Sequence, residues 1–320
     1  MYIFDRVWGA SGMSEKSDLS TWRVDEGETD LHAPRVRAHP LFAKAARALA
    51  TNSLAAGDSG RALAGIMKDA GRYVAAMWAI YLHLSGGLTL PRLKEICVSS
   101  GFLSPGRARA MLLYMRYLGY VVPVSDRVRG EPQRYVPTAE FRESWRDHLR
   151  LAMQAACIIE PAVQTVIDRL QEEEVFERIA RLQAEGLLSL SRARDRETTH
   201  IRVFMHRHAG IQIMSTLLTT PGEAFPPEGA IPFSIAAASQ RFGVSRIHIR
   251  RMLNDALREG FFSQANDGVV VMTEKAREEL RGSYSMQFSQ LLASAAAVIV
   301  QAPAPHAQSG KTKVLAAAAS

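Results

Sequence analysis

Cysteine is scarce in this sequence, with Cys97 and Cys157 as the two examples in 320 residues. Two cysteines cannot form a disulfide framework, and their spacing rules out a CxxC metal pair. Each lies in a predicted helix, where a buried structural thiol is the expected role and redox sensing is the alternative. The fold is therefore expected to depend on a hydrophobic core.

Long apolar segments are also missing. The longest apolar run, from Leu291 to Val300, is too short to span a bilayer. The first residues, MYIFDRVWGA, lack the apolar core that follows the basic start of a signal peptide. We expect a cytoplasmic protein, nucleoid-associated if it binds DNA, with no membrane partner.

The motifs of common enzyme classes are absent as well. The chain contains no GxxxxGK[ST], GxGxxG, GxSxG or HExxH. The acidic stretch QEEEVFE at 171–177 is interpreted as a solvated helix face. Three histidines form H-x5-H-x-H at 200–208, but no Cys or Glu accompanies them at ligand spacing and neighbouring arginines oppose a cation. We therefore predict a protein that is not an enzyme and that uses neither a metal nor an organic cofactor.

Apolar and basic residues are abundant in the sequence. The composition is 47% hydrophobic and 22% charged, which is typical of a globular protein. The length suffices for two ordinary domains, each with its own core. The net charge of +7, with a pI near 9.6, favours polyanionic partners, nucleic acid first and an acidic membrane second.

Helical periodicity dominates the middle of the chain. Apolar residues recurring at spacings of three and four predict helices over 40–56, 61–84, 91–99, 107–118, 138–159, 161–186, 198–218, 233–241, 246–259 and from 273 onward. Two β-rich segments around polar tips, YVVPVSDRVRGEPQRYVPT and FFSQANDGVVVMT, predict β-hairpins. The fold class is therefore mainly α with short β-hairpins.

The order of these elements repeats along the chain. LSPGRARAMLLYMRYLGY aligns without a gap on VSRIHIRRMLNDALREGF, which places Ser104 on Ser245 and Gly119 on Gly260. After the hairpins, YVPTAEFRESW aligns on VVMTEKAREEL. We interpret this as an internal duplication. The predicted organisation is a flexible N-terminal arm (1–38), a first module with flanking helices (39–160), a helical linker (161–197), a second module with flanking helices (198–300) and a disordered tail (301–320).

The winged helix-turn-helix consists of a short helix, a tight turn, a second helix and a β-hairpin, in that order. With Val244-Ser245-Arg246, the Gly260-Phe261 exit and the segment SDRVRGEPQRYVPT, each half resembles the MarR-type family of bacterial transcription regulators. This resemblance implies two winged helix-turn-helix modules with long connecting or dimerisation helices, double-stranded DNA as partner, and a possible small-molecule effector. Family members carry one module and dimerise. This chain is therefore expected to be either a homodimer or a monomeric pseudo-dimer.

The predicted helix 246–259 has an apolar stripe opposite a basic face. At 100° per residue, Ile249, Met252, Leu253, Ala256 and Leu257 share the side that packs on the core. Arginine binds guanine and asparagine binds adenine bidentately in the major groove. The candidate DNA-binding residues of this half are base-edge candidates Arg251 and Asn254, backbone or neighbouring-base candidates Arg246, His248 and Arg250, and the helix-capping Ser245, whose hydroxyl could meet a phosphate.

In the first copy the hairpin is basic and the outward face of the second helix is apolar, the reverse of the second copy. Its predicted helix has an apolar outward face that includes Leu113 and Tyr117, so Ser104, Arg107 and Arg109 are the candidates at its start and flanks. Its hairpin is basic, with Arg127, Arg129 and Arg134, whereas the second hairpin tip, SQANDG, has no basic residue. We therefore expect the second helix to read the major groove and the first hairpin to bind backbone or minor groove.

Two other functions remain open from the sequence. Some replication initiators also join two winged helices in one chain. A structural adaptor in chromosome organisation could instead use winged helices to bind protein partners. The arginines at 246–251 favour DNA over a pure protein adaptor. Sequence-specific regulation of transcription is therefore the leading expectation.

Overall fold

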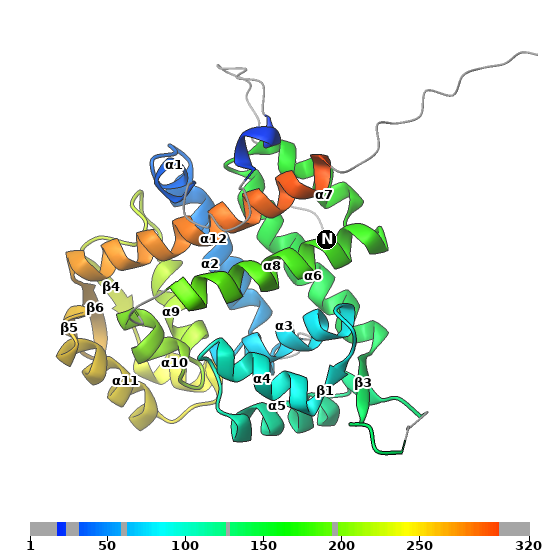
Figure 1. Cartoon of the computed structure of the whole chain (residues 1–320). Helices are drawn as coiled ribbons and strands as arrows, with labels where there is room; N and C mark the ends of the chain where they lie inside the picture. The colour runs from blue at the N-terminus through cyan, green and yellow to red at the C-terminus, as the bar shows by residue number, and fades with distance from the viewer. Residues whose placement is uncertain (1–17, 24–31, 59–62, 126–128, 194–197, 301–320) are drawn as a thin grey trace, which may run out of the picture.

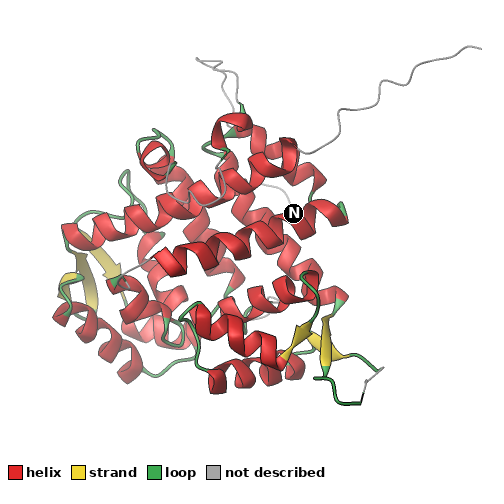
Figure 2. Ribbon diagram, in the orientation of Figure 1, coloured by secondary structure: helices red, strands yellow, loops and turns green. Residues whose placement is uncertain are grey.

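The computed structural model describes residues 18–23, 32–58, 63–125, 129–193 and 198–300. Over this part of the chain the protein is mainly helical, with two small three-stranded antiparallel sheets on opposite sides of the molecule (Figures 1 and 2). The predicted fold class, mainly α with short β-hairpins, is confirmed. No described helix combines the length and the apolar character that a membrane crossing requires.

Seven elements follow the same order in each half of the chain. The first set is α3 (Ala70–Leu84), β1 (Leu88–Thr89), α4 (Leu90–Ser99), α5 (Pro105–Tyr117), β2 (Val121–Pro123), β3 (Arg134–Pro137) and α6 (Ala139–Cys157). The second set is α9 (Gly210–Leu218), β4 (Ala230–Phe233), α10 (Ile235–Phe242), α11 (Arg246–Arg258), β5 (Phe262–Ala265), β6 (Gly268–Met272) and α12 (Glu274–Val300). The sheets also match, with strand orders β1-β3-β2 and β4-β6-β5.

The correspondence extends to individual hydrogen bonds at the helix ends. Gly119 and Gly260 follow α5 and α11 with φ of 73° and 69°, a left-handed conformation that favours glycine. The hydroxyls of Thr138 and Thr273 donate to the carbonyls of these glycines at 3.0 and 2.8 Å. The same hydroxyls accept the first-turn N–H groups of α6 and α12 at 3.3 and 3.2 Å. Equivalent residues therefore connect the end of α5 to the start of α6 and the end of α11 to the start of α12.

Each sheet contains a strand that the sequence pattern did not predict. β1 has two residues, in register with Arg134 and Tyr135 of β3, and two residues are too few to show an alternating pattern. β4 lies mostly between the predicted helices 198–218 and 233–241, where no strand was predicted, and it pairs with β6. Because β4 is an edge strand, Pro232 can lie within it without removing a bond that the sheet needs.

Two predicted helices are interrupted. The range 61–84 becomes helical at Ala70, because the carboxylate of Asp69 accepts the N–H of Arg72 at 3.0 Å and starts α3 there. The range 198–218 divides into η3 (Ile201–Met205), a π-helical turn, and α9. A side chain at Gly210 would place its Cβ 1.7 Å from the carbonyl oxygen of Phe204, so the chain turns sharply between these helices.

The predicted linker and arm contain packed helices. The linker includes η2 (Pro161–Val163), α7 (Gln164–Arg169) and α8 (Glu173–Ala193), and α8 runs beside α12 (Figure 1). Within the predicted flexible arm, η1 (Leu19–Trp22) and α1 (Ala33–Arg37) both contact α12. These two arm segments are therefore folded, contrary to the expectation of flexibility, while 1–17, 24–31 and the predicted tail lie outside the described residues.

A buried tryptophan attaches the folded part of the arm to the rest of the protein. Trp22 is buried, and its indole N–H donates to the Glu160 carboxylate at 3.0 Å. The guanidinium of Arg35 lies 4.0 Å from the centroid of the Trp22 ring, and Arg37 forms an ion pair with Glu278 on α12. Burial of an indole that also finds a hydrogen-bond acceptor offsets the entropy lost on ordering this segment.

The two halves share one hydrophobic core. Buried apolar residues of α2 (Phe42–Ala56), α3, α6, α9 and α12 belong to one continuous cluster. Phe42 of α2 contacts Phe288 of α12, with ring centroids 6.4 Å apart. The expectation that each module has a separate core therefore does not match the packing, because α2 lies against both α6 and α9.

Candidate nucleic-acid interface

A tight turn holds α10 and α11 in a fixed relation. Gly243 ends α10 with φ of 66°, a left-handed conformation. The N–H of Val244 donates to the Ser239 carbonyl at 3.2 Å, and the Ser239 hydroxyl donates to the Val244 carbonyl at 2.6 Å. Ser245 then caps α11 by accepting the N–H of His248 at 3.1 Å. The predicted cap is confirmed.

The inner face of α11 fixes which side chains face solvent. Ile249, Met252, Leu253 and Ala256 are buried, as the apolar stripe predicts, and Leu257 is partly buried against the core. Burial of each of the three larger side chains contributes roughly 1.5–3 kcal/mol, so rotating the helix about its axis would be costly. The opposite side of α11 is therefore held outward.

Four of the predicted DNA-binding residues lie on this outward side. Arg246, Arg250, Arg251 and Asn254 are exposed, and none of their side chains has a hydrogen bond or an ion pair with another described residue. By contrast, Arg258 at the end of the same helix forms an ion pair with Asp255. Hydrogen bonds from Arg258 and then Arg207 hold the pKa of the Asp255 carboxyl below its usual range. The unpaired cations therefore concentrate toward the N-terminal part of α11.

His248 has a structural contact that the sequence did not predict. Its side chain is half-buried, and its Nε2–H donates to the carbonyl of His208 at 2.9 Å. Arg207 reaches Asp255 from the same segment, and Arg202 on η3 forms an ion pair with Glu259. The ring therefore fastens α11 to the segment that follows η3, and the DNA contact predicted for His248 stays a prediction.

The corresponding helix of the first half, α5, has a different surface. Ser104 caps it by accepting the N–H of Arg107 at 3.4 Å, and Arg107 and Arg109 are exposed. On its outward side, Leu113 is 49% exposed and Tyr117 is 85% exposed. These fractions are high for apolar and aromatic side chains, so the apolar outward face expected from the sequence is present on α5.

The two hairpins also differ. In the first, Arg127 lies outside the described residues, Arg129 is exposed, and Arg134 in β3 is exposed beside Gly87. In the second, the Asp267 carboxylate accepts the N–H of Ile235 at 3.1 Å. The second tip is therefore folded back on the start of α10, whereas the first presents cationic side chains to solvent.

These elements lie along one side of the molecule. In Figure 1, α11, α5 and the β2–β3 hairpin are arranged along the lower edge, and the long helices α8 and α12 lie above them. At α10 this arrangement is fixed by an ion pair. There, Arg241 forms an ion pair with Asp58 after α2 at 3.0 Å. No sequence signal connects these two residues, which are 183 positions apart.

The residues considered for metal or redox chemistry have structural environments. Among the described residues, no three His, Cys, Asp or Glu side chains are grouped as metal ligands. His200 is buried, and its Nδ1 lies 2.7 Å from the Glu279 carboxylate on α12. Cys97 is buried, and burial raises the pKa of its thiol to about 12, which disfavours the reactive thiolate.

The chain was compared with models of protein families, with curated proteins and with solved structures. None of these comparisons found a match. Function is therefore inferred from the residues and from their arrangement.

Proposed function

We propose that this protein binds double-stranded DNA through two winged helix-turn-helix modules in tandem and regulates transcription, as the resemblance to MarR-type regulators implies. The order helix, strand, helix, turn, helix and hairpin in both halves supports the winged-helix assignment. The shared order and the equivalent caps at Thr138 and Thr273 support an internal duplication. In this proposal the protein is cytoplasmic and associated with the nucleoid.

The observation that carries the proposal is the exposed basic face of α11. The side chains of Arg246, Arg250 and Arg251 are exposed and have no partner among the described residues. The buried apolar stripe fixes the orientation of the helix that carries them. Asn254 lies three positions after Arg251, one turn along the same face. A recognition helix enters the major groove with its N-terminal residues toward the base edges, and arginine and asparagine are the side chains that bind guanine and adenine bidentately.

The differences between the halves indicate a division of labour. α11 carries the side chains for reading bases, and the first hairpin carries Arg129 and Arg134 for phosphate or the minor groove. The apolar side chain of Leu113 on α5 suits contact with a thymine methyl group better than hydrogen-bonded reading. Two unequal surfaces in one chain favour a DNA site without twofold symmetry.

Fluorescence anisotropy with a random-sequence duplex, measured at about 50 and about 200 mM salt, tests DNA binding. Each phosphate contact contributes about 0.9 to the slope of log affinity against log salt. The proposal expects a negative slope that becomes shallower when Arg246, Arg250 and Arg251 are replaced by alanine. Arg258→Ala is the matched control, because this arginine is on the same helix and paired.

Selection of bound duplexes from the random pool then tests sequence specificity. The expected motif has two unequal halves. Binding that is independent of salt, or absent, would favour an adaptor that uses the exposed Leu113 and Tyr117 surface for a protein partner. Immunoprecipitation across the genome separates scattered promoters, expected of a transcription regulator, from a single origin, expected of a replication initiator.

A further inference from the structure

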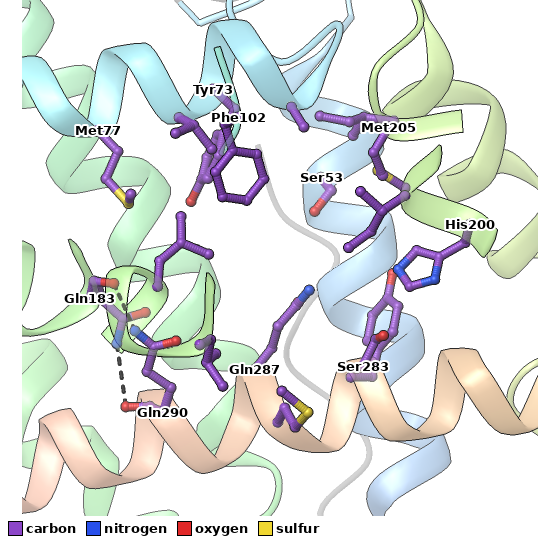
Figure 3. A pocket seen from close by; sticks show the side chains of 18 of the residues that line it. Ser53, Tyr73, Met77, Phe102, Gln183, His200, Met205, Ser283, Gln287 and Gln290 are labelled. Atoms are coloured by element: carbon purple, nitrogen blue, oxygen red, sulfur yellow. Dashed lines mark hydrogen bonds between the residues drawn. The ribbon is translucent and has the colours of Figure 1, made fainter. Parts of the chain in front are cut away.

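A large cavity lies in the centre of the protein, where the two halves meet. Its volume is about 570 Å³, and side chains of α2, α3, α6, α8, α9 and α12 line it together with η3 and the segments before α3 and α5. Figure 3 shows these side chains converging on a common space from opposite sides. Sites for drug-sized ligands commonly measure about 300–1,000 Å³, so this cavity is large enough for one.

The lining of the cavity is apolar and adaptable. Its described lining includes no Asp, Glu, Lys or Arg, although these residues make up 22% of the chain. Methionine is frequent among the lining residues, which include Met67, Met77, Met205, Met214 and Met286. Methionine is flexible and polarisable, so such a wall accommodates ligands of varied shape.

The titratable pair Tyr73 and His148 at one side of the cavity is uncharged near neutral pH. The Tyr73 hydroxyl lies 3.2 Å from Nε2 of His148. Burial raises the pKa of Tyr73 to about 12 and lowers the pKa of His148 to about 4. Burial likewise raises the pKa of Tyr284 on the opposite wall. These groups offer hydrogen bonds to a ligand but no charge to balance one.

Glutamines supply the polar groups on the α8–α12 side. The Gln183 amide donates to the Ser294 hydroxyl at 2.8 Å, and the Gln290 amide donates to the Gln183 carbonyl at 2.7 Å, which fixes both side chains. The side-chain amide of Gln287 has no hydrogen bond with another described residue, and Figure 3 shows it directed into the cavity. An amide can both donate to a ligand and accept from it.

We propose that this cavity binds an uncharged, mostly apolar small molecule with a hydrogen-bonding group that meets Gln287 or the Tyr73–His148 pair. The described lining disfavours a carboxylate or an ammonium ligand, because it includes no Asp, Glu, Lys or Arg and its His200 is already paired with Glu279. Apolar burial in the methionine-rich wall supplies the affinity, and the few polar groups orient the ligand.

The cavity also touches the segments that position both helices of the proposed DNA interface, so this part of the inference rests on the proposed function. Phe102, in the turn before α5, lines the cavity and contacts the ring of His206, with centroids 6.5 Å apart. His206 is followed by Arg207 and His208, which bind Asp255 and His248 of α11. A ligand that displaces Phe102 would therefore shift α5 and α11 together and change the DNA affinity.

Two fluorescent probes with the same aromatic skeleton test the site without DNA. N-phenyl-1-naphthylamine is uncharged, and 1-anilinonaphthalene-8-sulfonate carries a sulfonate. The full chain is expected to bind the neutral probe at least tenfold more tightly. Leu187→Trp fills the cavity from α8 and should abolish this binding, whereas Ser189→Trp, exposed on the same helix and outside the lining, should not. Equal binding of both probes, or binding unaffected by Leu187→Trp, would overturn the site.

A charge introduced at Gln287 tests the reason for the preference. Gln287→Lys places a cation beside the cavity and should shift the preference toward the sulfonate probe; an unchanged preference would contradict the argument from charge. For the coupling, the neutral probe should change DNA affinity at least threefold in the native chain and not in Leu187→Trp. Probe binding without a change in DNA affinity overturns the coupling alone. A chain that binds the probe but never binds DNA refutes the proposed function and leaves the ligand site intact.

Discussion

Replacing Arg251 with alanine is the sharpest test of whether α11 reads DNA as proposed. The side chain is exposed, it has no ion pair with a described residue, and the buried stripe of Ile249, Met252 and Leu253 lies on the other side of the helix. The substitution therefore removes a guanidinium and leaves the packing of α11 unchanged. A bidentate contact with guanine is worth about 1–3 kcal/mol, so affinity for the selected site should fall about 5- to 150-fold.

The salt dependence distinguishes a base contact from a phosphate contact. Loss of one phosphate contact lowers the slope by about 0.9, which makes a difference of about 3.5-fold between 50 and 200 mM salt. Arg251→Ala should reduce affinity for the selected duplex far more than for a random one, with little change in slope. Arg250→Ala should weaken both duplexes alike and lower the slope.

Anisotropy with both duplexes at both salt concentrations makes these measurements, and Arg258→Ala is the control. Arg258 is equally part of α11 but is held by Asp255, so its removal should change affinity less than about twofold. If Arg251→Ala and Arg258→Ala had the same small effect on the selected duplex, the assignment of α11 as the reading helix would be refuted.

Three further predictions follow from other parts of the molecule. Replacing Arg129 and Arg134 with alanine should lower the salt slope by about 2 without changing the selected motif, and an unchanged slope would show that the first hairpin does not touch DNA. Thr138→Ala and Thr273→Ala should each reduce the free energy of unfolding by about 1 kcal/mol, measured by urea titration; clearly unequal losses would count against equivalent capping in the two halves. Because burial lowers the pKa of His148 to about 4, the folded protein keeps this ring neutral at pH values where the unfolded chain protonates it. The free energy of unfolding should therefore be unaffected by His148 above pH 6.5 and should fall, by at most about 3 kcal/mol, as the pH falls toward 4. Urea titrations at pH 7 and pH 5 should show a smaller decline for His148→Gln than for the native chain, and an equal decline would contradict the burial argument.

Local patterns were sufficient to predict the proposed reading helix. The Ser245 cap, the buried stripe and the glycine exit all lie within about four turns of helix, so their periodicity and their neighbours in sequence determine them. The outward positions of Arg246, Arg250, Arg251 and Asn254 then follow from geometry alone. The same holds for the exposed Leu113 and Tyr117 on α5.

What could not be predicted depends on contacts between distant segments. His248 looks like another DNA-facing cation in the sequence, and only its packing against the segment after η3 shows that its ring binds the His208 carbonyl. Likewise, Trp22 in a charge-rich arm gives no local sign of its buried acceptor, Glu160, which is 138 positions away. The cavity has no sequence signature, because its described walls come from six α-helices and the segments between them, which meet only in the folded chain.

The single core that joins the two halves has a consequence for binding to DNA. In a homodimer the two surfaces that read DNA are identical, so the complex looks the same from either end of the duplex. Dilution also separates the two subunits. Here α5 and α11 differ in charge and belong to one polypeptide, so bringing them together requires no association of subunits. Bound to DNA, such a chain would present different surfaces toward the two ends of the duplex. It would mark a direction along the duplex as well as a position.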